Sequence, residues 1–252
     1  MENTDKPDAN RGSAPILRIE AVTKSFGGLI AVNDVTFDVM PREIVALIGP
    51  NGAGKTTLFA VISGFQRPNQ GRIVFNEKDV TAFAPARMAR LGIARSFQIV
   101  QVFADLTVHE AVTAAALMRH SMRDALARAD EVLALVGLSA RRSSVTPELS
   151  LQDRKLLEVA KCLATDPQLI LLDEVMAGLT LAEAEVVLGV IRRLRGEGMT
   201  FVLVEHVMPI VMSIADRIVV MNFGQKIADG PPASILDDPL VRDAYFGEDF
   251  HA

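Results

Sequence analysis

The sequence predicts an α/β protein with a mixed or mostly parallel sheet at its core, an antiparallel β part at its N-terminus and a helical insert. Three observations lead to this fold class. Short β-rich runs separated by turns fill the N-terminal part, helical periodicity dominates from about Leu106 to Ala164, and strands alternate with helices in the C-terminal part. Such alternation is typical of βαβ units, which place parallel strands side by side in one sheet.

Length and composition limit the size of the domain, the class of partner and the cellular compartment. With 252 residues, half of them hydrophobic, the chain can bury the core of one large domain. The formal net charge of −5 disfavours nucleic acid as a partner, because phosphate backbones select basic surfaces. The single cysteine excludes an internal disulfide and fits a reducing compartment.

The chain is expected to divide into a tail and one domain. Residues 1–14 are predicted to be disordered, because the opening run MENTDKPDANRG is polar and lacks the apolar segment of a signal peptide. Residues 15–252 are expected to form a single domain with a helical subdomain at about 99–165. No apolar run reaches the roughly 18–20 residues that span a bilayer, so we expect a cytosolic protein that can dock on a membrane from inside.

The N-terminal part is predicted to begin with strands at 16–22 and 32–39, with a turn at 26–28 between them. The continuous apolar run at 43–49 is typical of a strand buried on both faces. A helix is expected from Lys55 to about Ser63, where Gly64 ends it. One further strand and one short helix are expected before the insert, at 71–80 and 85–92.

Three helices are expected in the insert, at 106–118, 123–138 and 149–164. The first has Thr107 as its N-cap and Glu110 three residues later, which is a capping box. Gly137 ends the second. Cys162 lies on the apolar stripe of the third and is interpreted as a core residue. After the insert, strands are predicted at 168–174, 200–206 and 216–222, and helices at 181–195 and 207–215.

The clearest motif is GPNGAGKT, which matches the pattern G-x-x-x-x-G-K-[ST] between a predicted strand and a predicted helix. Its glycines let backbone N–H groups converge on phosphate oxygens, and the helix N-terminus adds its dipole. Lys55 is expected to reach the β- and γ-phosphates, and the Thr56 hydroxyl is expected to ligate Mg²⁺. The predicted ATP-binding residues are Gly49, Pro50, Asn51, Gly52, Ala53, Gly54, Lys55, Thr56 and Thr57.

Two strand ends carry the other candidate residues. LILLDE places Asp173 and Glu174 just past a predicted buried strand. Asp173 is expected to hold Mg²⁺, and Glu174 to polarise an attacking water. His206 follows the next predicted strand, TFVLVE, and is therefore expected at the same sheet edge, where ligands collect.

Together with Gln98 and the helix start Leu149-Ser150, these motifs resemble the ATP-binding cassette (ABC) family over roughly residues 16–247. The resemblance implies a P-loop ATP-binding cassette fold, hydrolysis of ATP and a need for Mg²⁺. It implies that Gln98 senses the γ-phosphate at the metal and couples to a transmembrane partner. It also implies that His206 contacts the γ-phosphate and that Phe26 places its ring against adenine. Packing of Phe26 against the core is the alternative.

A narrower resemblance links the chain to the ATPases of branched-chain amino acid importers. It rests on segments spread along the chain, among them FGGLIAVNDVTF, RLGIARSFQ and the tail VRDAYFGED. It implies permease subunits, a second cassette and, indirectly, a periplasmic binding protein as partners, at the cytoplasmic face of the membrane. The alternatives are a urea/amide or lipopolysaccharide system, a soluble ABC ATPase acting on ribosomes or DNA, and a cassette with weak hydrolysis that serves mainly in ATP-dependent dimerisation.

The segment LSLQDRK departs from the family. The resemblance implies a signature of Leu-Ser-x-Gly-Gln type, in which Ser150 contacts the ATP of the partner cassette, yet Gln152 and Asp153 stand where glycine and glutamine belong. Ser150 and Asp153 have the spacing of a capping box, which favours the isolated helix. A carboxylate about 7 Å from a phosphate charge costs on the order of 2 kcal/mol at an effective dielectric near 20. We therefore hypothesise a sound P-loop and a weak signature, which would impair both ATP sites of a homodimer. The importer resemblance favours pairing with a different cassette over self-pairing, since that family commonly pairs two different ATPases.

The combined change Gln152→Gly and Asp153→Gln tests this hypothesis. It is expected to raise the ATPase rate or the ATP affinity of the assembled complex, because it removes a carboxylate and a Cβ from the phosphate contact. Steady-state ATPase assays on the wild-type and altered complexes measure this, and equal rates with equal affinities would contradict the hypothesis.

Overall fold

The computed structural model describes residues 14–96 and 105–246 of the chain. The predicted tail, apart from Ala14, and the predicted site residue Gln98 lie outside these ranges. Within them, no helix has both the length and the apolar character needed to cross a bilayer.

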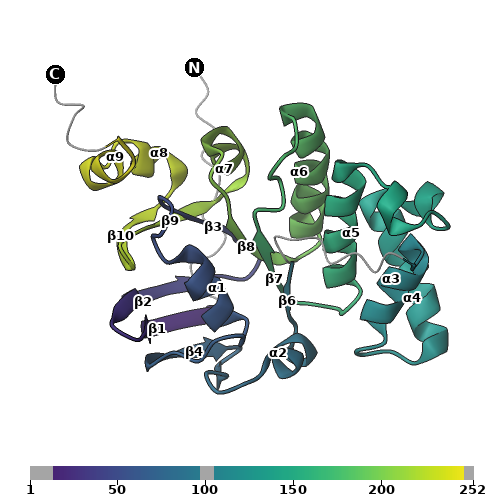
Figure 1. The fold of residues 1–252 in the computed structure, drawn as a ribbon, viewed down its shortest axis with the longest axis horizontal. Coiled ribbons are helices and arrows are strands. Elements are labelled where there is room, and N and C mark those ends of the chain that lie inside the picture. Colours follow the sequence, from purple (N-terminus) through teal and green to yellow (C-terminus); the bar gives the residue numbers. More distant parts are fainter. Residues whose placement is uncertain (1–13, 97–104, 247–252) are drawn as a thin grey trace.

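The centre of the fold is a six-stranded sheet in the order β10-β9-β3-β8-β7-β6 (Figure 1). Five of its strands run parallel, and β10 pairs antiparallel with β9. The α/β class with a mixed, mostly parallel sheet is therefore confirmed. The strands are β3 (Ile44–Ile48), β6 (Ile93–Arg95), β7 (Leu169–Asp173), β8 (Thr200–Val204), β9 (Arg217–Asn222) and β10 (Gln225–Gly230).

Strand β3 is buried along its whole length, as its continuous apolar run predicts. Ile44, Ala46 and Ile48 face one hydrophobic cluster, while Val45 and Leu47 face the other. Alternate side chains of a strand point to opposite faces of the sheet. The central strand therefore joins the two halves of the core.

A four-stranded antiparallel sheet, in the order β2-β1-β4-β5, forms the predicted N-terminal β part. Its strands are β1 (Leu17–Phe26), β2 (Leu29–Val39), β4 (Gln70–Phe75) and β5 (Lys78–Asp79). The single strand predicted at 71–80 is wrong. Asn76 and Glu77 have φ values of +46° and +61°, which suit a two-residue hairpin turn, so the segment folds back on itself.

Helices cover both faces of the central sheet. Helix α1 (Lys55–Ile62) packs between the two sheets, where Leu58 and Phe59 are completely buried (Figure 1). The helices on the other face or along the edges are α2 (Pro85–Leu91), α6 (Leu181–Gly196), α7 (Met208–Ile214), α8 (Pro232–Leu236) and α9 (Pro239–Phe246). The sequence analysis did not anticipate β6, β10, α8 or α9, which are short or follow the last recognised strand.

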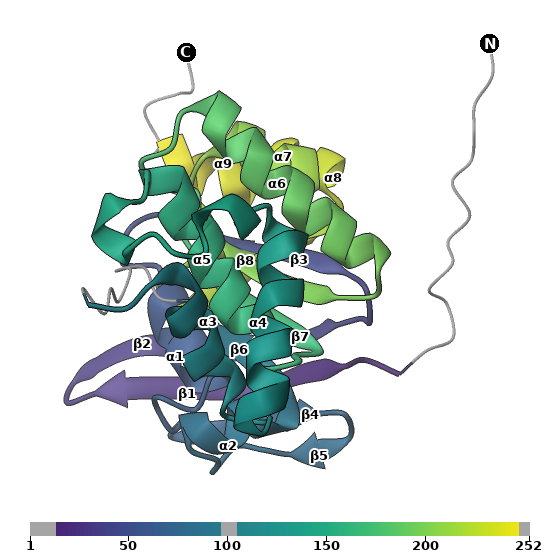
Figure 2. The same ribbon diagram turned by 90° about the vertical axis from the view of Figure 1, so that its right-hand side faces the viewer.

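The three expected insert helices pack together at the right-hand end of the molecule in Figure 1, the end that faces the viewer in Figure 2. They are α3 (Val108–Ala116), α4 (Met122–Val136) and α5 (Leu151–Leu163), with short 3-10 turns at Ser139–Arg141 and Thr146–Glu148 before α5. Cys162 on α5 is buried, and burial raises the pKa of its thiol to about 12. This confirms its interpretation as a core residue.

The acidic residues at the N3 positions of α3 and α5 behave differently: the glutamate bonds back to its N-cap residue, and the aspartate does not. Thr107 and Glu110 form the complete capping box that the sequence predicts. At Ser150 the structure describes half of the predicted box: the hydroxyl accepts from the Asp153 N–H at 3.1 Å, while the Asp153 carboxylate lies 3.7 Å from Arg141. Aspartate is one methylene shorter than glutamate, so its carboxylate reaches back to the N-cap less easily. The full capping box predicted at Ser150 is therefore corrected to a single hydroxyl cap.

Candidate functional site

The candidate site lies at the carboxyl edge of the central sheet. Strands β3, β7 and β8 run parallel, and Val204 pairs with both Leu47 and Asp173. The loop after β3 and the residues after β7 and β8 therefore leave the sheet side by side, which is where ligands collect in open α/β sheets.

The phosphate-binding loop connects β3 to α1. Gly49, Gly52 and Gly54 all have φ values between +82° and +148°, a region that L side chains rarely adopt. A Cβ on Gly49 would collide with the backbone oxygen of Met221, and one on Gly54 with that of Ala31. Gly49 and Gly54 are thus required for two reasons: their positive φ values, and the lack of room for a Cβ.

Lys55 lies inside this loop. Its Nζ donates to the carbonyl oxygens of Gly49 at 2.7 Å and Pro50 at 2.9 Å. Burial lowers its pKa, and the negative charges of Glu174 and Asp173 oppose that shift. The lysine and both carboxylates predicted for the site therefore share one electrostatic environment. The next residue, Thr56, is exposed at the first turn of α1.

Asp173 is a buried carboxylate with an arginine partner. Its side chain is 3% exposed, and Oδ2 accepts from Arg95 Nη2 at 2.8 Å. Arg95 also donates to Ser63 Oγ at 3.0 Å, and Ser96 Oγ accepts from the Asp173 N–H at 3.0 Å. The end of β6 therefore fixes both the side chain and the backbone of Asp173.

Glu174 adopts an unusual backbone conformation. Its φ of +48° lies in the left-handed region, which costs a residue with a Cβ roughly 1–2 kcal/mol. Its N–H donates to Val204 O at 3.0 Å, and its carbonyl accepts from the Ala177 N–H at 3.1 Å. Strained backbone that persists in a folded protein is found most often at functional sites.

The end of β8 contributes two polar residues of different character. His206 is exposed and can therefore contact a ligand from solvent. Glu205, just before it, is only 1% exposed. Its Oε1 accepts from the Met176 N–H at 3.0 Å, and burial raises the pKa of its carboxyl.

Phe26 and Ser150 belong to other elements. Phe26 ends β1 and is 46% exposed, with Lys24 Nζ 4.9 Å from the ring centroid. This exposure argues against the alternative of a ring packed on the core. Ser150 is exposed at the start of α5. The structure thus groups Lys55, Asp173, Glu174 and His206, and it presents Phe26 and Ser150 at the surface.

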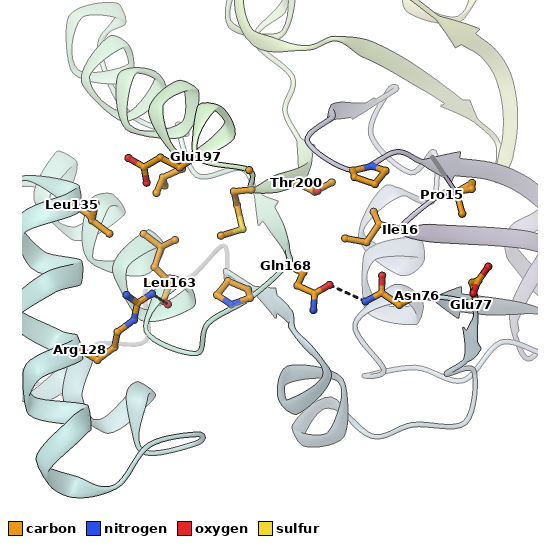
Figure 3. Close-up of a pocket in the computed structure, with 16 residues that line it drawn as sticks. Pro15, Ile16, Asn76, Glu77, Arg128, Leu135, Leu163, Gln168, Glu197 and Thr200 are labelled. Atoms are coloured by element: carbon orange, nitrogen blue, oxygen red, sulfur yellow. Dashed lines mark hydrogen bonds between the residues drawn. The ribbon is translucent and has the colours of Figure 1, made fainter. Parts of the chain in front are cut away.

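A cavity of about 690 Å³ lies elsewhere, near the amino ends of β7 and β8 (Figure 3). Several of its polar side chains have partners within the protein. Asn76 donates to Gln168 at 2.8 Å, and Arg128 pairs with Asp166 at 2.9 Å. None of the predicted site residues lines it, so we assign the chemistry to the opposite edge of the sheet.

The donor atoms at the carboxyl edge fit a hard cation. Asp173 offers carboxylate oxygens and Thr56 a hydroxyl oxygen, and oxygen is the ligand that Mg²⁺ prefers. Asp173 Oδ2 is committed to Arg95. The ion pair with Arg95 uses only Oδ2, so the other carboxylate oxygen is the one that would face a metal. Mg²⁺ commonly binds one or two carboxylates together with phosphates and water.

Comparison with known proteins identifies the fold family. A family model described as "ABC transporter" matches residues 32–177. The chain belongs to the ABC transporter family. A second model, described as "Branched-chain amino acid ATP-binding cassette transporter", matches residues 225–251. The resemblance based on sequence motifs is therefore confirmed.

Two relatives span almost the whole of this ABC cassette. The high-affinity branched-chain amino acid transport ATP-binding protein LivG of Salmonella typhimurium is 38% identical over 94% of this chain and 99% of its own. The protein BraF of Pseudomonas aeruginosa, which carries the same description, is 39% identical with the same coverage of both chains.

Solved structures agree with the fold. A nucleotide-free ATP-binding cassette from an ABC transporter superposes with a TM-score of 0.87 at 32% identity, covering 93% of this chain and all of its own. The ADP conformation of the cassette MJ1267 gives a TM-score of 0.86 at 33% identity, covering 94% of this chain and all of its own. The cassette architecture is thus confirmed by structure as well as by sequence.

Three residues near this site were missed in the sequence analysis: Arg95, Lys155 and Glu205. Each carries a signal that could have been used. Arg95 and Glu205 are charged residues at strand ends, like Asp173. Lys155 lies among the buried positions of α5, where a charged residue requires a partner.

The Arg95–Asp173 pair yields a stability prediction. We expect Arg95→Gln to lower the free energy of unfolding by about 3 kcal/mol, because it leaves a buried carboxylate without its cation. The control Arg90→Gln removes an exposed arginine of α2 and is expected to cost under about 1 kcal/mol. Urea denaturation of the purified chain compares the two. Equal losses of unfolding free energy in the two variants would show that the Arg95–Asp173 ion pair stabilises the fold no more than an exposed arginine does.

Proposed function

We propose that this chain binds and hydrolyses ATP as a subunit of an importer for branched-chain or related amino acids. The observation that carries the proposal is the convergence of the phosphate loop, Asp173, Glu174 and His206 at one sheet edge of an ABC cassette. The substrate class is supported by the names of the relatives LivG and BraF and by the matching C-terminal family model.

In the proposed reaction, water attacks the γ-phosphate of ATP in line with the departing ADP. Glu174 accepts the proton of that water, and Lys55 and His206 stabilise the negative charge on the phosphate oxygens. Thr56 and Asp173, together with Gln98, would hold Mg²⁺, which supplies positive charge to the phosphates. The strained backbone of Glu174 keeps its carboxylate at one place before ATP arrives.

The remaining roles follow from the same proposal. Phe26 is proposed to stack its exposed ring on adenine, and Ser150 to contact the ATP of a partner cassette. Residues 15–252 act as one nucleotide-binding domain, with the helices at about 99–165 as its subdomain. We place the chain on the cytoplasmic face of the membrane, against permease subunits that receive solute from an extracytoplasmic binding protein.

The partner cassette is proposed to be a different chain. Gln152 and Asp153 are half-buried at the start of α5, in the positions where the family has glycine and glutamine. Two copies of this chain would place this altered signature at both ATP sites of a dimer. If the second cassette has the usual signature, that signature can make all of its contacts with the ATP bound to this chain's P-loop.

Glu174→Gln tests the proposed reaction. The amide keeps the size of the side chain and loses the base, so ATP binding is expected to remain within about threefold while turnover falls at least a hundredfold. Nucleotide binding and phosphate release are measured on the assembled transporter, with leucine uptake into cells as the physiological readout. Retained ATP turnover in the Glu174→Gln variant would point to another base. ATP hydrolysis by the wild-type transporter without leucine uptake would point to another solute.

A further inference from the structure

The backbone around Glu174 is held by contacts that the proposed reaction does not explain. Besides its bonds to Val204 and Ala177, the Glu174 carbonyl accepts from Lys155 Nζ at 3.3 Å. Two residues later, the Met176 N–H donates to the Glu205 carboxylate at 3.0 Å. A strained peptide is thus fixed from α5 on one side and from the end of β8 on the other.

Both charged groups are deeply buried. Lys155 is 5% exposed and Glu205 is 1% exposed. Burial raises the pKa of the Glu205 carboxyl, and the charge of Lys155 is among the smaller effects that oppose this shift. Glu205 Oε2 is buried and has no hydrogen-bond partner among the described residues. Burying a lysine and a carboxylate is costly, and apolar residues of similar size would pack there at a lower cost. Their presence therefore calls for a role beyond packing.

Their positions define that role. Lys155 lies on α5, the helix that begins at Ser150, and reaches the carbonyl of Glu174 itself. Glu205 immediately precedes His206 and reaches the loop that follows Glu174. Each residue joins the peptide of the proposed base to an element that carries another proposed ATP contact.

We propose that Lys155 and Glu205 are positioning residues that hold the Glu174 backbone in its left-handed conformation, so that its carboxylate meets the attacking water. This inference rests on the proposed function of Glu174 as the base. Neither side chain is proposed to touch ATP, and both act through the loop formed by Glu174, Met176 and Ala177.

Two substitutions at Glu205 separate its hydrogen bond from its charge. Glu205→Gln keeps an oxygen that accepts the Met176 N–H, whereas Glu205→Met is neutral, similar in size and has no such acceptor. In the assembled transporter, we expect kcat of Glu205→Met to be at least tenfold below that of Glu205→Gln, with KM for ATP within threefold. The control is Glu158→Met, which removes another buried carboxylate, 3% exposed and paired with Lys161 on α5. It is expected to keep kcat within threefold of wild type.

A second pair covers the case in which Glu205→Met does not fold. Lys155→Arg keeps a cationic donor, and Lys155→Met removes it. We expect the arginine variant to retain at least a third of the wild-type kcat and the methionine variant to lose at least tenfold, again without a matching change in KM.

Hydrogen exchange of the full chain without nucleotide supplies a readout independent of turnover. The amides of residues 174–179 are expected to exchange at least tenfold faster in Glu205→Met than in Glu205→Gln or Glu158→Met. Equal kcat values within each pair, or a loss of kcat without faster exchange, would overturn the positioning role. Absence of ATP hydrolysis by the wild-type transporter would instead overturn the proposed function.

Discussion

One buried strand, β3, determines where the chemistry of this cassette takes place. Its alternate side chains enter the two hydrophobic clusters on opposite faces of the central sheet, so the strand has no freedom to shift. The phosphate loop that follows it is fixed by the same constraint, since Gly49 and Gly54 pack against the backbone of Met221 and Ala31 without room for a Cβ. The loop is therefore preorganised by packing, and binding of ATP needs little further ordering of the backbone.

Around this loop, the sheet edge concentrates charge that the protein must compensate internally. Asp173 forms an ion pair with Arg95 from the end of β6, and Glu205 accepts a hydrogen bond from the Met176 N–H. Glu174 follows Asp173 directly and precedes Met176 by two residues, and it is half-buried and strained at its backbone. The neighbouring elements thus hold the backbone of Glu174, the residue proposed as the base, by hydrogen bonds. The positions of β6, β8 and α5 therefore all affect the position of Glu174, the proposed base.

The sequence predicted the parts of this arrangement that depend on local signals. The Gly-Lys-Thr loop, the Thr107 cap and the apolar run of β3 each act within a few residues, and all appear in the structure. The hairpin at Asn76 was missed because it depends on two left-handed residues with no glycine to mark them. The pairings of Arg95 with Asp173 and of Glu205 with Met176 join residues 78 and 29 positions apart. Such pairs are set by strand order, which local periodicity does not contain.

We propose that this cassette has unequal halves: a competent P-loop with its own base, and a signature in which Gln152 and Asp153 weaken the contact to a partner's ATP. Vanadate trapping of photoreactive ATP in the assembled transporter tests it most directly, because it records which subunit retains ADP after one turnover. We expect the trapped ADP mainly on this chain, because its P-loop would face the signature of the second cassette. Equal labelling of both cassettes, or labelling mainly of the partner, would contradict it.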